Sequence, residues 1–252
     1  MRNHAINFEG NQMIISLASG SFWRSFRNKN GADALQLVQK LPVKGVELTL
    51  GKKDQFERFH LRTFHKKLLQ KFDYVSVHAP FRSAKSYQNP EEHEKDLSRI
   101  KEIVEESSAQ TIVFHPHYLP NKKILKKFRF NIAVENMEKR KKVPLQRLAT
   151  LMQDYKTGFC LDTSHAYEYG AFRTAELLRR FKPKLLQIHL SANYRHHNHR
   201  PLTRASLAFL KSIEPIKDTN VPVILEENFS GKSLSLAKKE IEWARAFFGE
   251  QK

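Results

Sequence analysis

Eight short apolar runs recur along the chain, and a helix-like segment separates each run from the next. The runs are Met13–Ala18, Gly45–Leu50, Tyr74–His78, Thr111–His115, Asn131–Glu135, Gly158–Asp162, Leu185–Leu190 and Val221–Glu226. The helix-like segments are Ala32–Lys40, Lys53–Lys71, Glu91–Ser107, Lys122–Lys127, Leu145–Tyr155, Ala171–Phe181, Arg204–Ile213 and, after the last run, Ser233–Phe248. This alternation of strands and helices favours a parallel sheet with helical crossovers.

Eight such units in 252 residues predict one (β/α)8 TIM barrel, with residues 1–252 forming a single domain. The fourth unit is short, so its helix must be brief. A doubly wound open sheet is the alternative fold, but it would normally carry a glycine-rich phosphate loop after an early strand. Only Gly20 and Gly31 follow the first run, and they do not form that pattern.

Polar residues stand at the carboxyl ends of six predicted strands. In the third strand, Val75 and Val77 alternate with His78, and Glu135 and Asp162 hold the same phase in the fifth and sixth strands. Period-two alternation aims such residues into the barrel, at the face where TIM-barrel active sites lie. The fourth, seventh and eighth strands end in the same way, with His115, His189 and Glu226.

These strand ends predict a metal site. Burying several carboxylates together is costly unless cations compensate their charge, and imidazoles beside carboxylates suit zinc, manganese and other divalent metals. A single histidine at a strand end is more often a hydrogen-bonded core residue, but the repetition over six strands favours ligands. Cys160 is the only cysteine, which excludes an intrachain disulfide and a zinc site built on several thiolates. We expect Cys160 inside the barrel, one layer below Asp162.

The strand-end motifs, taken in order, resemble those of the xylose isomerase-like superfamily of metal-dependent barrels. That superfamily includes the endonuclease IV family and many sugar isomerases and epimerases. The resemblance extends over most of the chain, from Gly45 to Asn228. The motifs that carry it are Gly45-Val46-Glu47-Leu48, His78-Ala79-Pro80, His115-Pro116, Glu135-Asn136, Asp162-Thr163-Ser164-His165-Ala166, His189-Leu190 and Glu226.

The resemblance to the endonuclease members implies divalent metal ions, with zinc as the metal and up to three ions bound. A first ion would take His78, His115 and Glu135. A second ion would share Glu135 as a bridge and add the strand-end residues Asp162, His189 and Glu226.

A third ion would take His165 and an Asp-x-His pair from the loop after the seventh strand. The loop here reads His197-Asn198-His199. His199 matches the family's histidine, whereas His197 stands where an aspartate is usual, so the site would lose one negative charge. With a shifted register, His196 would serve instead.

The isomerase and epimerase members imply a simpler site with one divalent metal, Mn or Mg included, at the positions of Glu135, Asp162, His189 and Glu226. Glu135 and Glu226 would then be the catalytic pair that exchanges protons with a substrate carbon next to a carbonyl. Substrate binding would fall to Arg195 or Arg200, although neither matches the family's arginine cleanly.

The additional ligands favour the hydrolase over the isomerase. His78, His115, His165 and His199 are not required for proton exchange, but they are expected where a metal cluster activates water against a phosphodiester. We therefore expect a metal-dependent phosphodiesterase resembling endonuclease IV, a DNA-repair enzyme that would act on abasic-site DNA or a related phosphoester. A sugar or sugar-phosphate isomerase or epimerase is the alternative.

Charge supports an anionic partner. The chain has 44 Lys and Arg against 26 Asp and Glu, a formal net charge of +18. Such an excess favours DNA or a phosphorylated small molecule, while the alternative is a generally basic protein with solvated lysines. Phe81, next to the His-Ala-Pro motif, is expected to contact the substrate or to pack on a neighbouring loop.

Neither a membrane anchor nor a signal peptide is expected. The apolar runs are far shorter than the roughly 18 residues that cross a bilayer. The N-terminal stretch Met1–Gln12 has no apolar region of the kind that a signal peptide needs. We therefore expect a cytoplasmic protein without a membrane partner.

Overall fold

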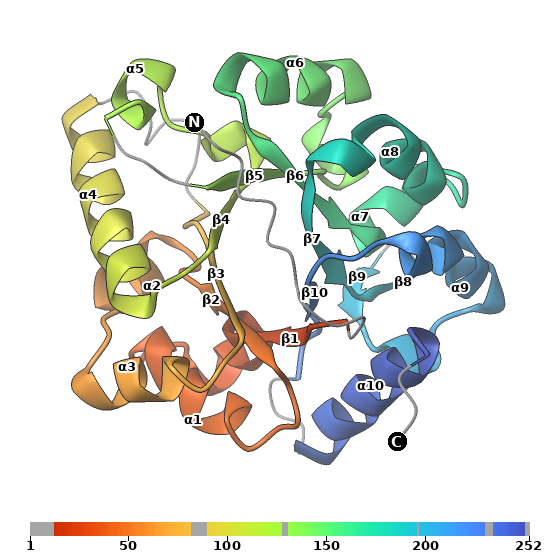
Figure 1. Cartoon of the computed structure of the whole chain (residues 1–252), viewed down its shortest axis with the longest axis horizontal. Coiled ribbons are helices and arrows are strands. Elements are labelled where there is room, and N and C mark those ends of the chain that lie inside the picture. Colours follow the sequence, from red (N-terminus) through yellow and green to blue (C-terminus); the bar gives the residue numbers. More distant parts are fainter. Residues whose placement is uncertain (1–12, 82–89, 128–130, 196, 230–233, 250–252) are drawn as a thin grey trace.

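The computed structural model describes residues 13–81, 90–127, 131–195, 197–229 and 234–249. Among these residues, eight parallel strands close into a barrel in the order β1-β10-β7-β6-β5-β4-β3-β2 (Figure 1). The predicted (β/α)8 barrel is therefore confirmed. The strands are β1 (Ile15–Ala18), β2 (Gly45–Thr49), β3 (Tyr74–His78), β4 (Thr111–Phe114), β5 (Ile132–Glu135), β6 (Gly158–Asp162), β7 (Leu185–Leu190) and β10 (Val223–Leu225).

Helices surround the barrel on its outside (Figure 1). The α-helices are α1 (Leu35–Val38), α2 (Lys53–Arg58), α3 (Thr63–Leu69), α4 (Pro90–Ser107), α5 (Lys122–Leu125), α6 (Leu145–Tyr155), α7 (Thr163–Tyr167), α8 (Arg173–Phe181), α9 (Leu207–Ile213) and α10 (Leu234–Phe247). Short 3-10 helices lie at η1 (Ser19–Phe26), η2 (Gly31–Ala34), η4 (Pro116–Tyr118), η5 (Lys139–Lys141), η6 (Lys182–Lys184), η7 (Leu202–Arg204) and η8 (Glu214–Asp218). The fourth helical crossover is brief, as expected, because α5 has only 4 residues.

The single helix predicted over Lys53–Lys71 is wrong, because the chain forms two helices, α2 and α3, in that segment. The link between them is held by side chains from elsewhere. Asn30 donates to the His60 carbonyl at 2.8 Å and accepts from the His60 backbone N–H at 3.1 Å. Arg99 donates to the Phe59 carbonyl at 2.9 Å. These bonds replace the helical hydrogen bonds that the break gives up.

A hairpin that the sequence did not predict follows β7. It consists of β8 (Ala192–Tyr194) and β9 (His197–Arg200), which pair antiparallel. Arg195 and His199 have positive φ angles of 49° and 56°. These left-handed residues disturb the regular alternation of side chains along the hairpin.

Two small apolar clusters lie apart from the main core. One is formed by Ile14, Ala18, Tyr74 and Ile224, and the other by Val113, Ala133 and Cys160. Cys160 is fully buried with His189 among its neighbours, so it lies inside the barrel, as predicted. Only glycine fits at position 45, because a Cβ atom there would overlap the Ser16 side chain and the Tyr74 carbonyl.

Between the strands and the surrounding helices lies a larger apolar core, which includes the fully buried Phe159, Phe209 and Phe229. No helix in the described part of the chain is both long enough and apolar enough to cross a membrane.

Candidate metal centre

The six strand-end residues converge at the carboxyl face of the barrel. His78, Glu135 and Asp162 are the last residues of β3, β5 and β6. His189 lies near the end of β7, and His115 and Glu226 directly follow β4 and β10. Above them is an open cavity of about 1340 Å³, whose wall includes His115, Glu135, His165, His199 and Glu226.

His78, His115 and Glu135 form the first group. Nε2 of His78 and Nε2 of His115 each lie 3.2 Å from Oε2 of Glu135. Nδ1 of His78 lies 3.0 Å from the Ala79 carbonyl oxygen, which only accepts, so Nδ1 carries a proton. In the neutral ring, the lone pair on Nε2 therefore faces the carboxylate, and a cation between them would satisfy both groups.

The spacing of the first group also suits a metal ion. Bonds of about 2.0–2.1 Å in a tetrahedral arrangement place two donor atoms roughly 3.3–3.4 Å apart. The nitrogen–oxygen distances of 3.2 Å are close to that value.

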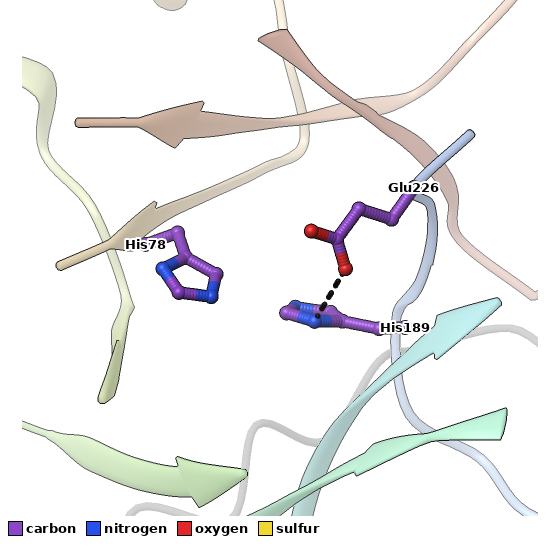
Figure 2. Close-up of side chains that lie close together, drawn as sticks. All are labelled: His78, His189 and Glu226. Atoms are coloured by element: carbon purple, nitrogen blue, oxygen red, sulfur yellow. Dashed lines mark ion pairs between the residues drawn. The ribbon is translucent and has the colours of Figure 1, made fainter. Parts of the chain in front are cut away.

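Glu135, Asp162, His189 and Glu226 form the second group, with ligand atoms within 4.8 Å of one another. Nδ1 of His189 lies 3.0 Å from Oε2 of Glu226, and Figure 2 shows these two side chains pointing toward each other across from the ring of His78. Asp162 Oδ2, His189 Nδ1 and Glu226 Oε2 are buried and make no hydrogen bond of regular geometry among the described residues, although the last two form this ion pair. Buried ligand atoms whose hydrogen bonding is incomplete fit a bound divalent cation.

Asp162, His165 and His199 form a third group within the same distance limit. Nδ1 of His165 donates to the Asn136 carbonyl and Nδ1 of His199 donates to the Glu226 carbonyl, each at 3.0 Å. Backbone carbonyls thus leave Nε2 of both rings for a ligand, as is usual for metal-binding histidines.

His197, expected as the third-site ligand, lies on the cavity wall but is exposed and belongs to none of these groups. His199, two residues further along the hairpin, has a left-handed backbone and is the one of these two histidines that belongs to the third group. His196, the substitute in a shifted register, lies outside the described residues.

Burial and neighbouring charges shift the pKa values of the acids and histidines in the centre. Burial opposes ionisation of Glu135, yet contacts with His115, His165 and His189 hold the pKa of Glu135 well below its usual range. Burial lowers the pKa of His165, but Asp162 and Glu135 outweigh that effect and raise the pKa to about 10.

Protons take part in the same charge balance at other positions of the centre. Burial disfavours the charged form of His189, but Cys160, Glu47 and Glu226 raise the pKa of this imidazole well above its usual value. Burial alone would raise the pKa of Glu226, and His189 and His199 bring it down to about 2. Without metal, protonated imidazoles therefore compensate the carboxylates.

Two further carboxylates reach the centre and were not singled out from the sequence. Glu47 on β2 is fully buried and lies 3.1 Å from Nε2 of His189. Glu47 alternates with Val46 and Leu48 along β2, and this alternation indicates that its side chain points into the barrel. Oε2 of Glu138 lies 3.3 Å from Nε2 of His165. Glu138 follows β5 in a non-periodic segment, so no pattern marked it.

The residues expected to bind substrate are placed differently. Phe81 stacks on His115 with ring centroids 4.9 Å apart and lines the cavity. Arg200 also lines the cavity. Arg195 is not among the residues of that wall, and its guanidinium lies 5.1 Å from the ring centroid of Tyr194.

Solved structures of similar fold include epimerases and an endonuclease. A D-tagatose 3-epimerase-like protein superposes with a TM-score of 0.69 at 17% identity, covering 93% of this chain and 97% of the other. D-allulose 3-epimerase from Methylomonas sp. has a TM-score of 0.68 at 12% identity, covering 93% and 97%. Endonuclease IV from Thermus thermophilus has a TM-score of 0.65 at 16% identity, covering 94% and 100%.

No protein-family model matches the sequence, and a search of curated proteins finds no match. The structural likenesses confirm the predicted TIM-barrel fold, which this endonuclease and these epimerases share.

Proposed function

We propose that this chain is a divalent-metal-dependent phosphodiesterase that acts on DNA or a related phosphoester, as the name of its structural relative endonuclease IV indicates. The observation that carries the proposal is the sharing of Glu135. This carboxylate belongs both to the group with His78 and His115 and to the group with Asp162, His189 and Glu226. Two adjacent cation sites joined by one carboxylate are typical of enzymes that cleave phosphoesters.

Some residues of the site would hold the cations, and others orient these ligands or shield the site. Divalent ions at these sites would supply water activation at neutral pH and would stabilise charge on the leaving oxygen. Ala79 and Asn136 fix the tautomers of His78 and His165 through their backbone carbonyls. Phe81 packs on His115 and shields that edge of the site.

The wall of the cavity has many Lys and Arg side chains interspersed with the carboxylates Asp54, Glu57, Glu138 and Glu168, and these cations support an anionic substrate. Lys139 and Lys141 lie on η5, directly after the strand that carries Glu135. Cations placed around a concave site attract phosphates and position them near the reacting centre. The positively charged residues of the wall are Arg24, Lys52, Lys53, Lys139, Arg140, Lys141 and Arg200.

A sugar or sugar-phosphate epimerase or isomerase is the second candidate. The observation that favours it is the four-residue group of Glu135, Asp162, His189 and Glu226, which holds one cation without help from the other histidines. In that case Glu135 and Glu226 would exchange protons with a carbon next to a carbonyl.

The decisive experiment compares the zinc- or manganese-loaded wild type with a His78→Ala/His115→Ala double variant. We expect the wild type to cleave a duplex that contains an abasic site, with an activity that falls steeply as salt rises. The double variant should lose this cleavage and bind about one metal ion fewer per chain.

His60→Ala is the control for the loss of a histidine, because His60 contacts Arg58 and is not part of the cavity wall. Its metal content and cleavage should match those of the wild type. The phosphodiesterase proposal fails if the double variant keeps all of its metal while the wild type turns over a ketose and leaves the abasic duplex intact. The epimerase would then take its place.

A further inference from the structure

We propose that Glu138, rather than His197, supplies a carboxylate to a third divalent-cation site that also includes His165 and His199. This inference rests on the proposed function, because it adds a site to the same metal centre. The residues come from three segments, namely the stretch after β5, the helix α7 and the β8–β9 hairpin.

The first argument is the arrangement of protons on His165. Its Nδ1 donates to the Asn136 carbonyl at 3.0 Å, so in the neutral ring Nε2 has a lone pair and no proton. Oε2 of Glu138 lies 3.3 Å from that Nε2. In the metal-free protein a proton on Nε2 lies between these two atoms, and a divalent cation would take the place of that proton.

The second argument is the distance itself. Two ligands of one tetrahedral zinc ion, with bonds of about 2.0–2.1 Å, lie roughly 3.3–3.4 Å apart. The separation of 3.3 Å between Glu138 and His165 matches this, as do the 3.2 Å separations in the group of His78, His115 and Glu135.

The third argument is that Glu138 is already oriented. Its side chain is 8% exposed, and its other oxygen, Oε1, accepts from Nε of Arg140 at 2.8 Å. A hydrogen bond to the second oxygen of a metal-binding carboxylate is the usual way in which such a ligand is held in place. Oε2 is therefore the oxygen directed at His165.

The fourth argument is that the two segments are tied together. Asn198, between His197 and His199, donates to Oε1 of Glu168 at 2.9 Å. Oε2 of Glu168 accepts from the backbone N–H of Lys139 at 2.7 Å. Glu168 thus links the residue before His199 to the residue after Glu138, so the segments that carry the two ligands are held together.

His199 completes the set. Its Nδ1 donates to the Glu226 carbonyl, which leaves Nε2 for a cation, and its ring centroid lies 5.6 Å from that of His165. Asp162 forms a group with His165 and His199 and would add a further negative charge. His197 is exposed, whereas Glu138 is nearly buried and already lies against His165, so the carboxylate and not the imidazole is the proposed ligand.

The test counts zinc in metal-free protein that has been reloaded with zinc sulfate and desalted. We expect Glu138→Gln to bind one zinc ion fewer than the wild type and His197→Ala to bind as many as the wild type. His199→Ala is the positive control and should also lose one ion. Circular dichroism checks that each variant is folded.

A zinc-edge anomalous map of crystals of the loaded wild type gives a second readout that needs no variant. Glu138 should lie within about 2.0–2.2 Å of the third peak, the distance of a zinc–carboxylate bond. The inference is overturned if Glu138→Gln keeps the third ion, if His197→Ala loses it, or if the third peak has no contact with Glu138.

The stoichiometry of the wild type separates this inference from the proposed function. Two ions bound to the groups that share Glu135, with phosphoester cleavage retained, would remove the third site and leave the function standing. One ion at Glu135, Asp162, His189 and Glu226, without cleavage, would overturn both.

Discussion

Replacing Glu47 by glutamine should weaken metal binding at the second group without unfolding the barrel. Glu47 is fully buried on β2, and its Oε2 accepts from Ser76 at 3.0 Å and from Gln187 at 2.7 Å. The same oxygen lies 3.1 Å from Nε2 of His189. Nδ1 of His189 binds a cation only if Nε2 carries the proton, and Glu47 is the carboxylate that accepts a hydrogen bond from this Nε2–H.

A competing arrangement exists in the same network. The amide nitrogen of Gln187 lies 2.8 Å from Nε2 of His189, and an amide nitrogen only donates. If Gln187 donates to Nε2, the proton of His189 moves to Nδ1 and the metal-binding lone pair is lost. The negative charge of Glu47 favours the tautomer that leaves Nδ1 free for metal.

The expected size of the effect follows from the loss of one charge-assisted hydrogen bond. Bonds to charged groups contribute about 1.5–3 kcal/mol, against about 0.5–1.5 kcal/mol for neutral ones. The difference of about 1–1.5 kcal/mol corresponds to roughly tenfold in the dissociation constant, at the lower end of the 10–100-fold seen for such partners. The free energy of unfolding of the metal-free protein should change little, because weaker bonds offset the removal of a buried charge.

The assay is competition between the protein and a fluorescent zinc chelator, with denaturant unfolding of the metal-free protein alongside. Ser76→Ala is the matched control, because it removes one hydrogen bond from the same carboxylate and keeps the charge. We expect it to change the zinc affinity by less than about threefold, the equivalent of a weak neutral bond. A Glu47→Gln variant with wild-type zinc affinity would refute the role assigned to Glu47.

Three further outcomes are expected. Glu135→Gln should lose metal from both groups that share this residue and abolish turnover, with an unchanged far-UV circular dichroism spectrum; wild-type turnover at saturating metal would remove Glu135 from the mechanism. In metal-free protein the pKa of His165 is raised to about 10 from 6.5, so its stabilising contribution is complete below pH 6.5 and disappears as pH rises through 10. Urea titrations should therefore show stability falling over that range without zinc, and a flat profile would contradict the charge balance of the centre. Phe209→Ala removes a fully buried ring that packs on Tyr167 and should lower the free energy of unfolding by about 3–5 kcal/mol; a loss below about 1 kcal/mol would contradict the packing.

The barrel and the strand-end residues were predictable because both follow from a period of two. β3, β6 and β7 have the predicted bounds, Tyr74–His78, Gly158–Asp162 and Leu185–Leu190. In a closed parallel barrel the outward-facing side chains of each strand pack against the helices, so the alternating polar side chains at the strand ends point into the barrel at its carboxyl face. The positions of His78 and Asp162 therefore required no knowledge of distant contacts.

The remaining parts of the structure depend on contacts that local sequence does not encode. The break between α2 and α3 is stabilised by Asn30 and Arg99, which are distant in the chain. The hairpin strand β9 reads His197-Asn198-His199-Arg200 and has no apolar alternation to mark it. Glu138 acquires its place only when the stretch after β5 folds over His165.

The charge distribution links metal loading to substrate binding. Glu135, Glu138 and Glu226 line the cavity, and Asp162 belongs to the same buried group as Glu135 and Glu226, so a phosphoester approaching the metal-free centre meets several carboxylates. The Lys and Arg residues of the cavity wall attract the same anion. Divalent ions bound to the carboxylates would make the electrostatic potential there positive, like that near the Lys and Arg residues. Binding of an inert phosphoester to the catalytic face should therefore be stronger with zinc than without it, and by linkage the phosphoester should raise the affinity for zinc by the same factor.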